Sequence, residues 1–364
     1  MKEYLKVKYM RYERYIGAAG LLAGFIFDWI TLQRVDQPRE NLWMAALLLI
    51  AALGILALNY YYCRAPEARA VYRHYSFQFW LIFLIQFALG GILSAFLVLY
   101  FRSAVLSAAW PFLLLLIAAF VGNEIFKERY ARLSYQVGML YLAIFSFAIF
   151  AVPVLTHKIS AGIFLLSGVI SLVLIYGFVR LLRLIDRQYV AENKRHLLGF
   201  IIGLFVIINV FYFGNLIPPI PLSLKDAGAY HQVLRRDDGN YDVLAEKRPW
   251  WHRFLIYERL SLAAGEPVYA YSAVFSPTRL NTTIVHQWQR YDPAEDEWLD
   301  SGRVELPIAG GREGGFRTYS YQSVSSPAYW RVNVETERGQ LIGRIKFKIA
   351  EDDLAPFVNW EVLL

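Results

Sequence analysis

Long apolar runs separated by short charged connections fill the first 217 residues of the chain, and this pattern stops after them. Seven runs are long enough to cross ~30 Å of hydrocarbon as helices that rise ~1.5 Å per residue. Only Arg102 and Ser103 separate the third run from the fourth, which predicts a tight helical hairpin. The sequence thus predicts a seven-helix transmembrane domain over residues 1–217, with spans at 15–32, 42–62, 77–101, 104–123, 133–155, 161–182 and 197–217.

A second pattern, with a period of two residues, occupies the rest of the chain. Pro218, Pro219 and Pro221 resist helix formation, so residues 218–229 are expected to form an extended linker. Apolar and polar positions then alternate in short segments, which is typical of antiparallel strands with one solvated face. Strands are predicted at 230–234, 241–246, 267–276, 282–291, 297–306, 315–323, 328–336 and 340–350.

About eight short strands favour an immunoglobulin-like β-sandwich domain over residues 230–364. No disulfide within the chain can stabilise it, because Cys63 is the single cysteine and lies in the membrane half. Trp288, Trp330 and Phe347 are therefore expected to supply much of the core. Residues 337–340 are expected to form a hairpin turn between the last two strands. The predicted fold is a multi-pass helical bundle followed by an all-β domain.

Charge gives this architecture an orientation. Residues 1–223 carry 20 Lys and Arg against 10 Asp and Glu, whereas residues 224–364 carry 17 against 20. The basic residues concentrate in the N-terminal tail and the second, fourth and sixth connections, and this side of a membrane is normally cytoplasmic. With seven crossings, the β domain is extracytoplasmic, and we expect an inner-membrane protein with a periplasmic domain. The first apolar run is expected to be an uncleaved signal anchor. A slightly acidic soluble domain argues against a nucleic-acid partner.

Polar residues are sparse in the predicted spans. Asp28 is interpreted either as an ion contact or, preferably, as an interfacial carboxylate that pairs with Arg34 or Arg102. Gln86 and Asn209 are neutral, and hydrogen bonds between helices explain them; the same holds for Asn59 and Gln136.

Two GxxxG patterns bring glycines onto one face of a helix, and they consist of Gly20 with Gly24 and Gly199 with Gly203. Packing within the bundle is the first interpretation of these glycines. A homodimer seam is the second.

The β region contains candidate binding residues but no recognised catalytic, cofactor or metal motif. His286 lies on the same strand face as Trp288, so a hydrogen-bonded core histidine is a better interpretation than a catalytic base. Five acids at 292, 295, 296, 297 and 300 match no calcium loop and are interpreted as a solvated turn. Trp250 and Trp251 belong to an aromatic segment that either packs on the sandwich or rests on lipid. A cationic outer stripe suits anionic lipid or an acidic partner, and its members are Arg331, Arg344, Lys346 and Lys348.

Several short motifs resemble the bacterial domain-of-unknown-function family 2914. They are Thr282–Trp288 with its H-x-W, Phe316–Ser320 with its R-T-x-S, and Trp330–Val334 with its W-R-V-x-V, followed by Gly339 before a final strand. The resemblance covers roughly residues 265–350. It implies a β-sandwich tied to a membrane segment and carries no known activity.

Three hypotheses follow. The first is a non-enzymatic envelope protein whose β domain binds a protein, glycan or lipid. The second is a transporter or lipid-handling protein in which Asp28, Gln86 and Asn209 line a cavity. The third is an enzyme that uses His286 or Asp28.

Overall fold

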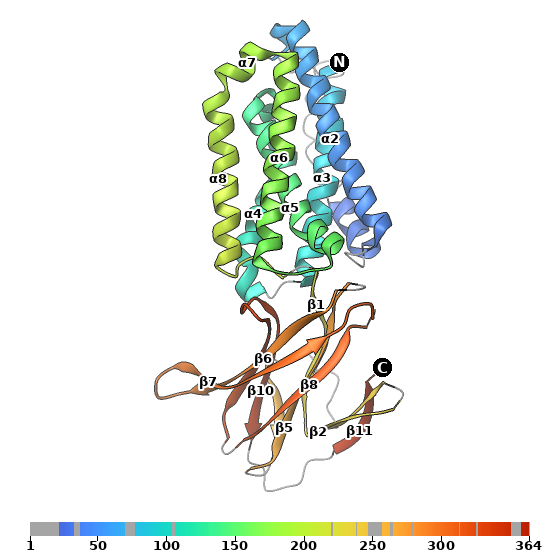
Figure 1. The fold of residues 1–364 in the computed structure, drawn as a ribbon, viewed down its shortest axis with the longest axis vertical. Helices are drawn as coiled ribbons and strands as arrows, with labels where there is room; N and C mark the ends of the chain where they lie inside the picture. The colour runs from blue at the N-terminus through green and yellow to red at the C-terminus, as the bar shows by residue number, and fades with distance from the viewer. Residues whose placement is uncertain are drawn as a thin grey trace, which may run out of the picture. The chain divides into compact units, whose positions relative to one another are not determined.

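The structure is a computed structural model, and it describes most of the 364 residues. The described ranges are 22–32, 37–69, 77–103, 106–219, 221–237, 239–246, 257–262, 265–277, 280–312, 314–324, 327–350 and 358–363. The chain divides into two compact units, a helical one (Met1–Arg102 and Trp110–Leu216) and a β-rich one (Ser103–Ala109 and Ile217–Leu364) (Figure 1). The aromatic segment with Trp250 and Trp251 lies outside the described residues.

Six helices in the described residues are long and apolar enough to cross a membrane. They are α2 (Pro38–Arg64), α3 (Phe77–Ser103), α4 (Leu106–Ile125), α5 (Leu133–Thr156), α6 (Ala161–Ile185) and α8 (Lys194–Phe213). Shorter elements are η1 (Pro66–Arg69), η2 (Lys127–Ala131) and α7 (Arg187–Glu192). The expected first span, 15–32, falls partly outside the described residues, and its described part is helical over Leu22–Thr31. The predicted hairpin between the third and fourth spans is confirmed, because α3 ends at Ser103 and α4 begins at Leu106.

Local sequence explains where several helices begin. Pro38 stands at the first turn of α2, where its missing N–H costs no hydrogen bond. The hydroxyl of Ser160 accepts a bond from the Ile163 N–H at the start of α6, and Asp186 caps α7 in the same way. α5 packs against α2, α6 and α8, and most of its side chains are buried. Helix α5 is therefore a central element of the helical unit.

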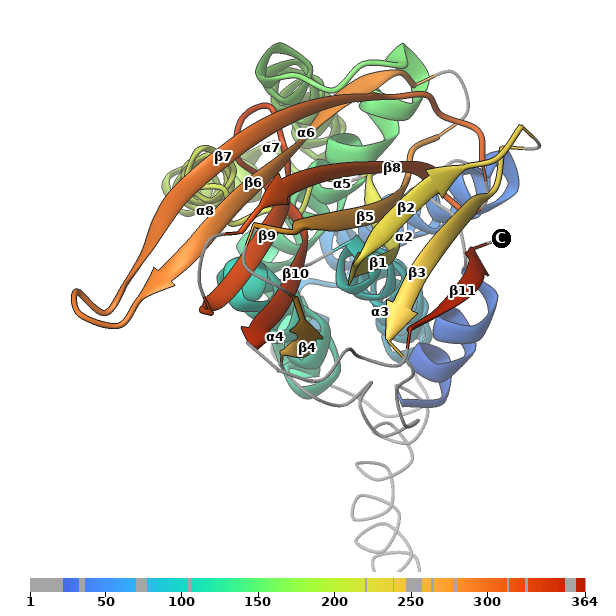
Figure 2. The same cartoon turned by 90° about the horizontal axis from the view of Figure 1, so that it is seen from below.

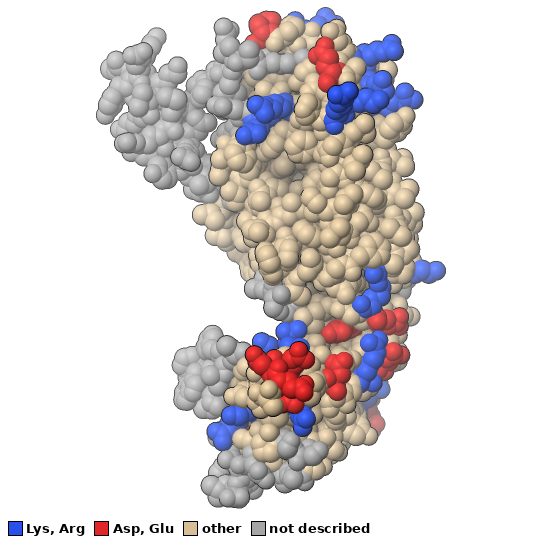
Figure 3. All heavy atoms as spheres, turned by 90° about the vertical axis from the view of Figure 1, so that its left-hand side faces the viewer, with Lys and Arg blue, Asp and Glu red and all other residues tan. Residues whose placement is uncertain are grey.

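The outward surface of the helical unit is apolar. Large apolar side chains on α2, α3, α6 and α8 are exposed, among them Leu53, Phe83, Val173 and Val210. On the face seen in Figure 3, charged side chains gather at one end of this unit, and a broad band beside them contains no Lys, Arg, Asp or Glu. Such a band matches the hydrocarbon of a bilayer, in which exposed apolar side chains are not penalised.

The GxxxG glycines do not pack as first expected. A Cβ atom added to Gly24, Gly199 or Gly203 would meet no atom within 4 Å, while Gly20 lies outside the described residues. For these three glycines, the expectation of close packing within the bundle is wrong as far as the described residues go, since the space in front of each is open. A homodimer seam stays a prediction.

The β unit contains eleven described strands. They are β1 (Ser223–Tyr230), β2 (Gln232–Arg235), β3 (Tyr241–Glu246), β4 (Glu258–Ser261), β5 (Pro267–Phe275), β6 (Thr282–Asp292), β7 (Glu297–Ile308), β8 (Phe316–Ser323), β9 (Tyr329–Thr336), β10 (Leu341–Ala350) and β11 (Val358–Leu363). All eight predicted strands are present within a few residues of their expected bounds. The expected linker over 218–229 needs correction, because β1 occupies most of it; Lys225, Asp226 and Gly228 hide the apolar alternation of this strand.

The strands form three sheets, with the orders β1-β5-β8, β4-β10-β9-β6-β7 and β11-β3-β2. The pairs are antiparallel except for β4 and β10, which run parallel. The predicted turn at 337–340 is confirmed: the Thr336 N–H donates to the Gln340 carbonyl at 2.9 Å, and Gly339 has a φ of +80°, which suits a residue without Cβ.

The first two sheets enclose a common core. Ala229, Val268 and Ala270 from the β1-β5-β8 sheet pack with apolar residues of β4, β6, β9 and β10. Trp288, Trp330 and Phe347 are buried in this core as predicted, and the Trp288 ring contacts the other two edge-on. Each of these aromatic side chains contributes on the order of 2–3 kcal/mol by transfer from water.

The third sheet forms an additional layer. Val233, Tyr241 and Val243 of β2 and β3 bury Tyr271 and Ala273, which lie on the face of β5 that points away from the main core. Figure 2 shows β2, β3 and β11 side by side. The β1-β5-β8 sheet is thus covered on both faces, whereas the β4-β10-β9-β6-β7 sheet, called the five-stranded sheet below, has one buried and one outer face.

Two glycines mark close approaches within the β unit. A Cβ on Gly343 would overlap the Leu224 side chain, and a Cβ on Gly310 would overlap the Pro277 backbone carbonyl. The first overlap can be relieved by moving a side chain, but the second cannot.

Candidate functional site

Polar side chains gather on the outer face of the five-stranded sheet. In β9, Trp330, Val332 and Val334 point into the core, so that the intervening residues, Arg331 and Asn333, lie on the opposite face. Strand register then places three cations of β10 directly across from β9: Arg344 opposite Asn333, Lys346 opposite Arg331, and Lys348 opposite Tyr329. The four cations of the predicted stripe therefore share one surface, which we call the outer face.

Neutral amides hold the two arginines in place. The Arg331 Nε donates to Gln289 Oε1 at 2.7 Å, and the Arg344 Nε donates to Asn333 Oδ1 at 2.6 Å. The Asn333 amide nitrogen donates to the same Gln289 oxygen at 3.2 Å, and the Gln289 amide nitrogen donates to Asp300 Oδ1 at 2.7 Å. This chain of contacts from β7 to β10 fixes both Nε groups, and within the described part of the chain the terminal guanidinium nitrogens make no hydrogen bond.

Aromatic rings border the cations. The guanidinium of Arg331 lies 4.2 Å from the centroid of the Trp298 ring. Lys346 lies over Tyr257 at 5.6 Å, and Lys348 lies over Tyr329 at 5.0 Å. These distances are within the range of attraction between a cation and an aromatic ring. The rings restrict where the cationic groups sit without neutralising them.

Burial changes the electrostatics of this face. It lowers the pKa of Arg344, and it lowers the pKa of Arg331, which the positive charge of Arg344 depresses further. Both guanidinium groups nevertheless stay charged, because arginine does not lose its proton in proteins. Burial also raises the pKa of Glu335, the nearby carboxyl on β9. The arginines are thus partly dehydrated cations, and binding an anion would stabilise them.

No ion pair between described residues includes either arginine of the outer face. Among the described residues of the β unit, ion pairs join His231 to Glu246, Arg236 to Asp242 and Arg303 to Glu305. None of these pairs includes Arg331 or Arg344. Sequence reasoning found the cations from their alternation but missed Gln289, Asn333 and Trp298, since only strand register brings these residues together.

The acidic turn beside β6 and β7 bonds mainly to itself. Asp292 accepts from the Ala294 N–H at 2.9 Å, and Tyr291 donates to Asp296. Figure 3 shows carboxylates gathered on the side of the β unit toward which this hairpin projects in Figure 1. The described part of the chain holds no group of three His, Cys, Asp or Glu residues arranged to bind a metal ion.

His286 is a core residue. It is completely buried, its Nε2 lies 2.8 Å from Ser272 Oγ, and its Nδ1 lies 2.8 Å from Ser320 Oγ. Trp288 donates to the same Ser320 hydroxyl at 3.0 Å. Burial lowers the pKa of His286 to about 4. The imidazole is therefore neutral at pH 7 and has no exposed edge at which a substrate could meet it.

The membrane candidates have separate partners. Gln86 donates to the Asn123 carbonyl of α4 at 2.7 Å, as expected for a bond between helices. For Asn209 this expectation is wrong, because it donates to the Phe205 carbonyl of its own helix at 2.7 Å. Asp28 is partly buried. Its expected partner Arg102 instead donates to the Trp29 carbonyl and lies over the Trp29 ring, while Arg34 lies outside the described residues. The contacts of these three candidates do not converge on one site.

Gln86 belongs to a buried polar network that the sequence did not reveal. Asn123 donates back to the Gln86 carbonyl at 2.9 Å and accepts from the Tyr130 hydroxyl. Gln136 donates to the Tyr130 carbonyl and accepts from Asn59 at 2.7 Å. The predicted role of Asn59 and Gln136 in joining helices is confirmed. This network links α2, α3, α4, η2 and α5, and its geometry is that of a structural connection.

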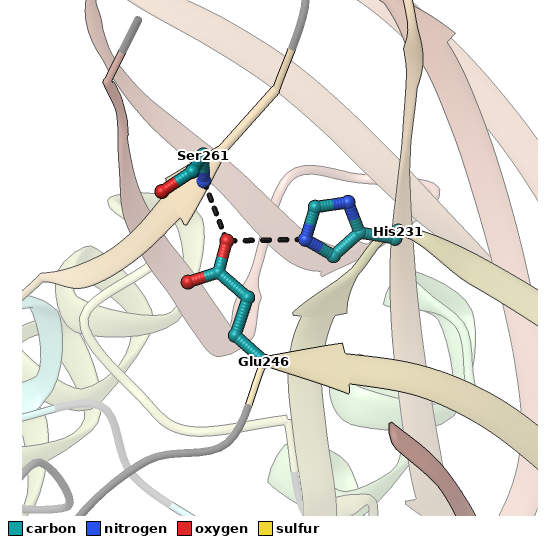
Figure 4. A network of polar contacts seen from close by, with 3 residues as sticks. All are labelled: His231, Glu246 and Ser261. Atoms are coloured by element: carbon teal, nitrogen blue, oxygen red, sulfur yellow. Dashed lines mark hydrogen bonds and ion pairs between the residues drawn. The ribbon is translucent and has the colours of Figure 1, made fainter. Parts of the chain in front are cut away.

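A second polar cluster in the β unit joins two sheets. Glu246 at the end of β3 accepts from the Ser261 N–H of β4 at 2.6 Å and lies 3.1 Å from His231 Nε2 (Figure 4). All three groups are largely enclosed by the surrounding strands. The cluster therefore fastens the third sheet to the edge of the five-stranded sheet.

A protein-family model matches the part of the chain that carries the outer face. Residues 281–349 match the model of a family described as a protein of unknown function, DUF2914, which confirms the resemblance seen in the sequence motifs. The match includes β6 to β9 and nearly all of β10, and hence the four cations of the outer face. No curated protein matches the chain.

The solved structures add little. The β-glucosidase of Listeria innocua in complex with gluconolactone aligns with 11% identity and a TM-score of 0.20, over 32% of this chain and 17% of its own. The alkylpurine DNA glycosylase AlkC of Pseudomonas fluorescens, bound to DNA containing an abasic site analog, aligns with 11% identity and a TM-score of 0.23, over 87% and 99%. Likeness at this level defines neither the fold nor the function of the present chain.

Proposed function

We propose that this chain is an integral inner-membrane protein whose extracytoplasmic β unit binds an envelope partner through its outer face. The observation that carries the proposal is the pair of half-buried arginines, Arg331 and Arg344, each of which is positioned by an amide oxygen, with the Trp298 ring against Arg331. A sheet face that only needs to be soluble does not require such fixed and partly dehydrated cations. A binding face does, because positioned groups lose less conformational entropy when a partner arrives.

The membrane placement follows from the helices and the charges. Six long apolar helices, together with the helical segment Leu22–Thr31, support a bundle of seven spans. The excess of Lys and Arg in alternate connections favours a cytoplasmic N-terminus and a periplasmic β unit. For the β unit itself, two sheets around one aromatic core support an immunoglobulin-like sandwich, extended by the third sheet and by the parallel β4–β10 pair.

Binding is a better interpretation than catalysis. His286 is enclosed in the core between two serine hydroxyls, and the arginines of the outer face do not lose their protons in proteins. Catalysis by general acid and base requires a group whose pKa lies near the working pH and that reaches the substrate. The outer face is instead equipped for recognition by charge and hydrogen bonding.

Site-specific photocrosslinking in native membranes tests this proposal. A photoreactive phenylalanine analogue replaces Tyr329 on the outer face, and a matched control replaces Tyr321, which is 63% exposed on the β1-β5-β8 sheet. We expect a defined adduct from position 329 and none from position 321, with mass spectrometry to identify it. Equal labelling from both positions, or none from position 329 and from a further probe at Arg303, would refute the proposed binding face.

A further inference from the structure

The arginine pair on the outer face has the features of a site for a tetrahedral anion. Arg331 and Arg344 belong to adjacent strands and lie near enough for the charge of one to depress the pKa of the other. The Nε atom of each bonds to a neutral amide oxygen, at 2.7 Å for Arg331 and 2.6 Å for Arg344. Two like charges held together in a half-buried setting are unfavourable unless an anion joins them.

The way in which the arginines are held selects the geometry of that anion. An Arg side chain whose Nε is already bonded can still offer its two terminal nitrogens, and these match two oxygens of a phosphate. A carboxylate presents two oxygens and is satisfied by one such fork, whereas a phosphate monoester has three terminal oxygens, so two forks can bind it if they share one of them. Lys346 faces Arg331 across the strand pair and adds a third positive charge.

The groups around the pair also explain why the cations remain available. Asp300 accepts from the Gln289 amide at 2.7 Å rather than bonding to a guanidinium. Burial lowers the pKa of both arginines; the charges of Glu335 and Asp300 oppose this shift for Arg331, and Glu335 acts on Arg344 in the same way. Among the described residues, however, neither carboxyl forms an ion pair with either guanidinium. Tyr257 and Trp298 stack against Lys346 and Arg331. The cations are therefore oriented by neutral groups and retain their positive charge for a ligand.

We propose that Arg331 and Arg344 together bind one phosphate group of the ligand, with Lys346 as an auxiliary cation. This inference rests on the proposed function, because it names the chemistry that the outer face recognises. A sugar phosphate and a phospholipid headgroup share this group, and the aromatic border is compatible with either.

Calorimetric titration of the full-length protein in a neutral detergent tests the inference. The probes are glucose 1-phosphate, glycerol 1-phosphate as a headgroup mimic, inorganic phosphate, and glucose as the uncharged control. We expect phosphate-bearing probes to bind and glucose to bind at least tenfold more weakly. Arg331→Gln and Arg344→Gln should each weaken phosphate binding about tenfold or more, which is the loss of one charge-assisted contact. A preference for one of the two esters identifies the source of the phosphate.

Two further variants separate recognition from misfolding. Gln289→Glu places a carboxylate beside Arg331, so it should weaken phosphate binding. Because the new carboxylate also faces Asp300, the thermal unfolding midpoint is expected to fall, and persistence of the fold is judged by a single cooperative unfolding transition. Arg290→Gln removes an exposed arginine from the neighbouring position in β6 and should leave binding unchanged. Phosphate affinities that are the same in the wild type, Arg331→Gln and Gln289→Glu would overturn the inference, as would no binding of any phosphate probe.

The crosslinking experiment distinguishes the two levels of proposal. If position 329 captures a partner but no phosphate probe binds, the binding face stands and its phosphate specificity is wrong. If neither experiment gives a signal, the proposed function fails together with the inference.

Discussion

Acidification should weaken the β unit through one buried imidazole. The pKa of His286 is lowered by burial from 6.5 to about 4 in the folded chain. A group whose pKa is depressed on folding binds protons more readily in the unfolded state. The contribution of His286 to stability is therefore complete above pH 6.5 and is lost as the pH falls from 6.5 toward 4.

The size of this effect follows from the shift. Each pKa unit corresponds to about 1.36 kcal/mol, so the shift of His286 amounts to roughly 3 kcal/mol in total. Linkage places about 2 kcal/mol of the loss between pH 7 and pH 5. This is a large part of the free energy of unfolding of a typical domain, which is about 5–15 kcal/mol.

Denaturant unfolding of the full-length chain in detergent measures this loss, with hydrogen exchange of peptides from β6 reporting on the β unit. The comparison variant is His286→Gln, which keeps a neutral amide between Ser272 and Ser320 and cannot titrate. We expect the wild type to lose about 2 kcal/mol more than the variant between pH 7 and pH 5. Equal pH dependence in the two proteins would show that the imidazole is not buried as a neutral group.

Three further predictions concern packing, the polar network and topology. Gly343→Ala should destabilise the β unit by about 1–3 kcal/mol, seen as unfolding at lower denaturant concentration in the same assay, because its new methyl group overlaps the partly buried Leu224 side chain. Gln136→Leu should lower the thermal midpoint of the helical unit, because it breaks the bond to Asn59. Adding Asn59→Leu should recover part of the loss, since the unsatisfied amide is removed as well. A double variant whose loss equals the sum of the two single losses would contradict this. Cys63 should react with a membrane-impermeant thiol reagent only after permeabilisation. In a Cys63→Ser chain, Tyr321→Cys should react in intact spheroplasts. The reverse pattern would contradict the proposed topology.

The elements that could be predicted well from the sequence are those with a strong periodicity of apolar residues. The apolar runs of α2 to α6 and of α8, and the alternation in β5 to β10, stand out locally because each depends on burial of one face or of the whole segment. Three strands were missed for physical reasons. β4 spans only Glu258–Ser261, β1 carries charged and glycine residues in its middle, and β11 pairs with β3 at a distance in sequence that no local pattern reveals.

The candidate site was predictable only in part. The four cations could be assigned to one face because β9 and β10 alternate cleanly and are joined by a recognisable turn. Their partners could not, since Gln289 reaches Arg331 through the pairing of β6 with β9, and Asp300 reaches Gln289 past an irregularity between β6 and β7. Register of this kind is set by the assembled core rather than by any single segment.

The parallel pairing of β4 with β10 has a consequence for how the domain is made. Glu258 lies beside Phe347, so the two partners are separated by roughly 90 residues of chain. At about 5–20 residues per second, β10 follows β4 out of the ribosome after roughly five to twenty seconds. During that interval β4 lacks its partner strand, and distant pairings of this kind fold slowly. The β unit is therefore expected to be most prone to aggregation before β10 is made, on whichever side of the membrane it folds.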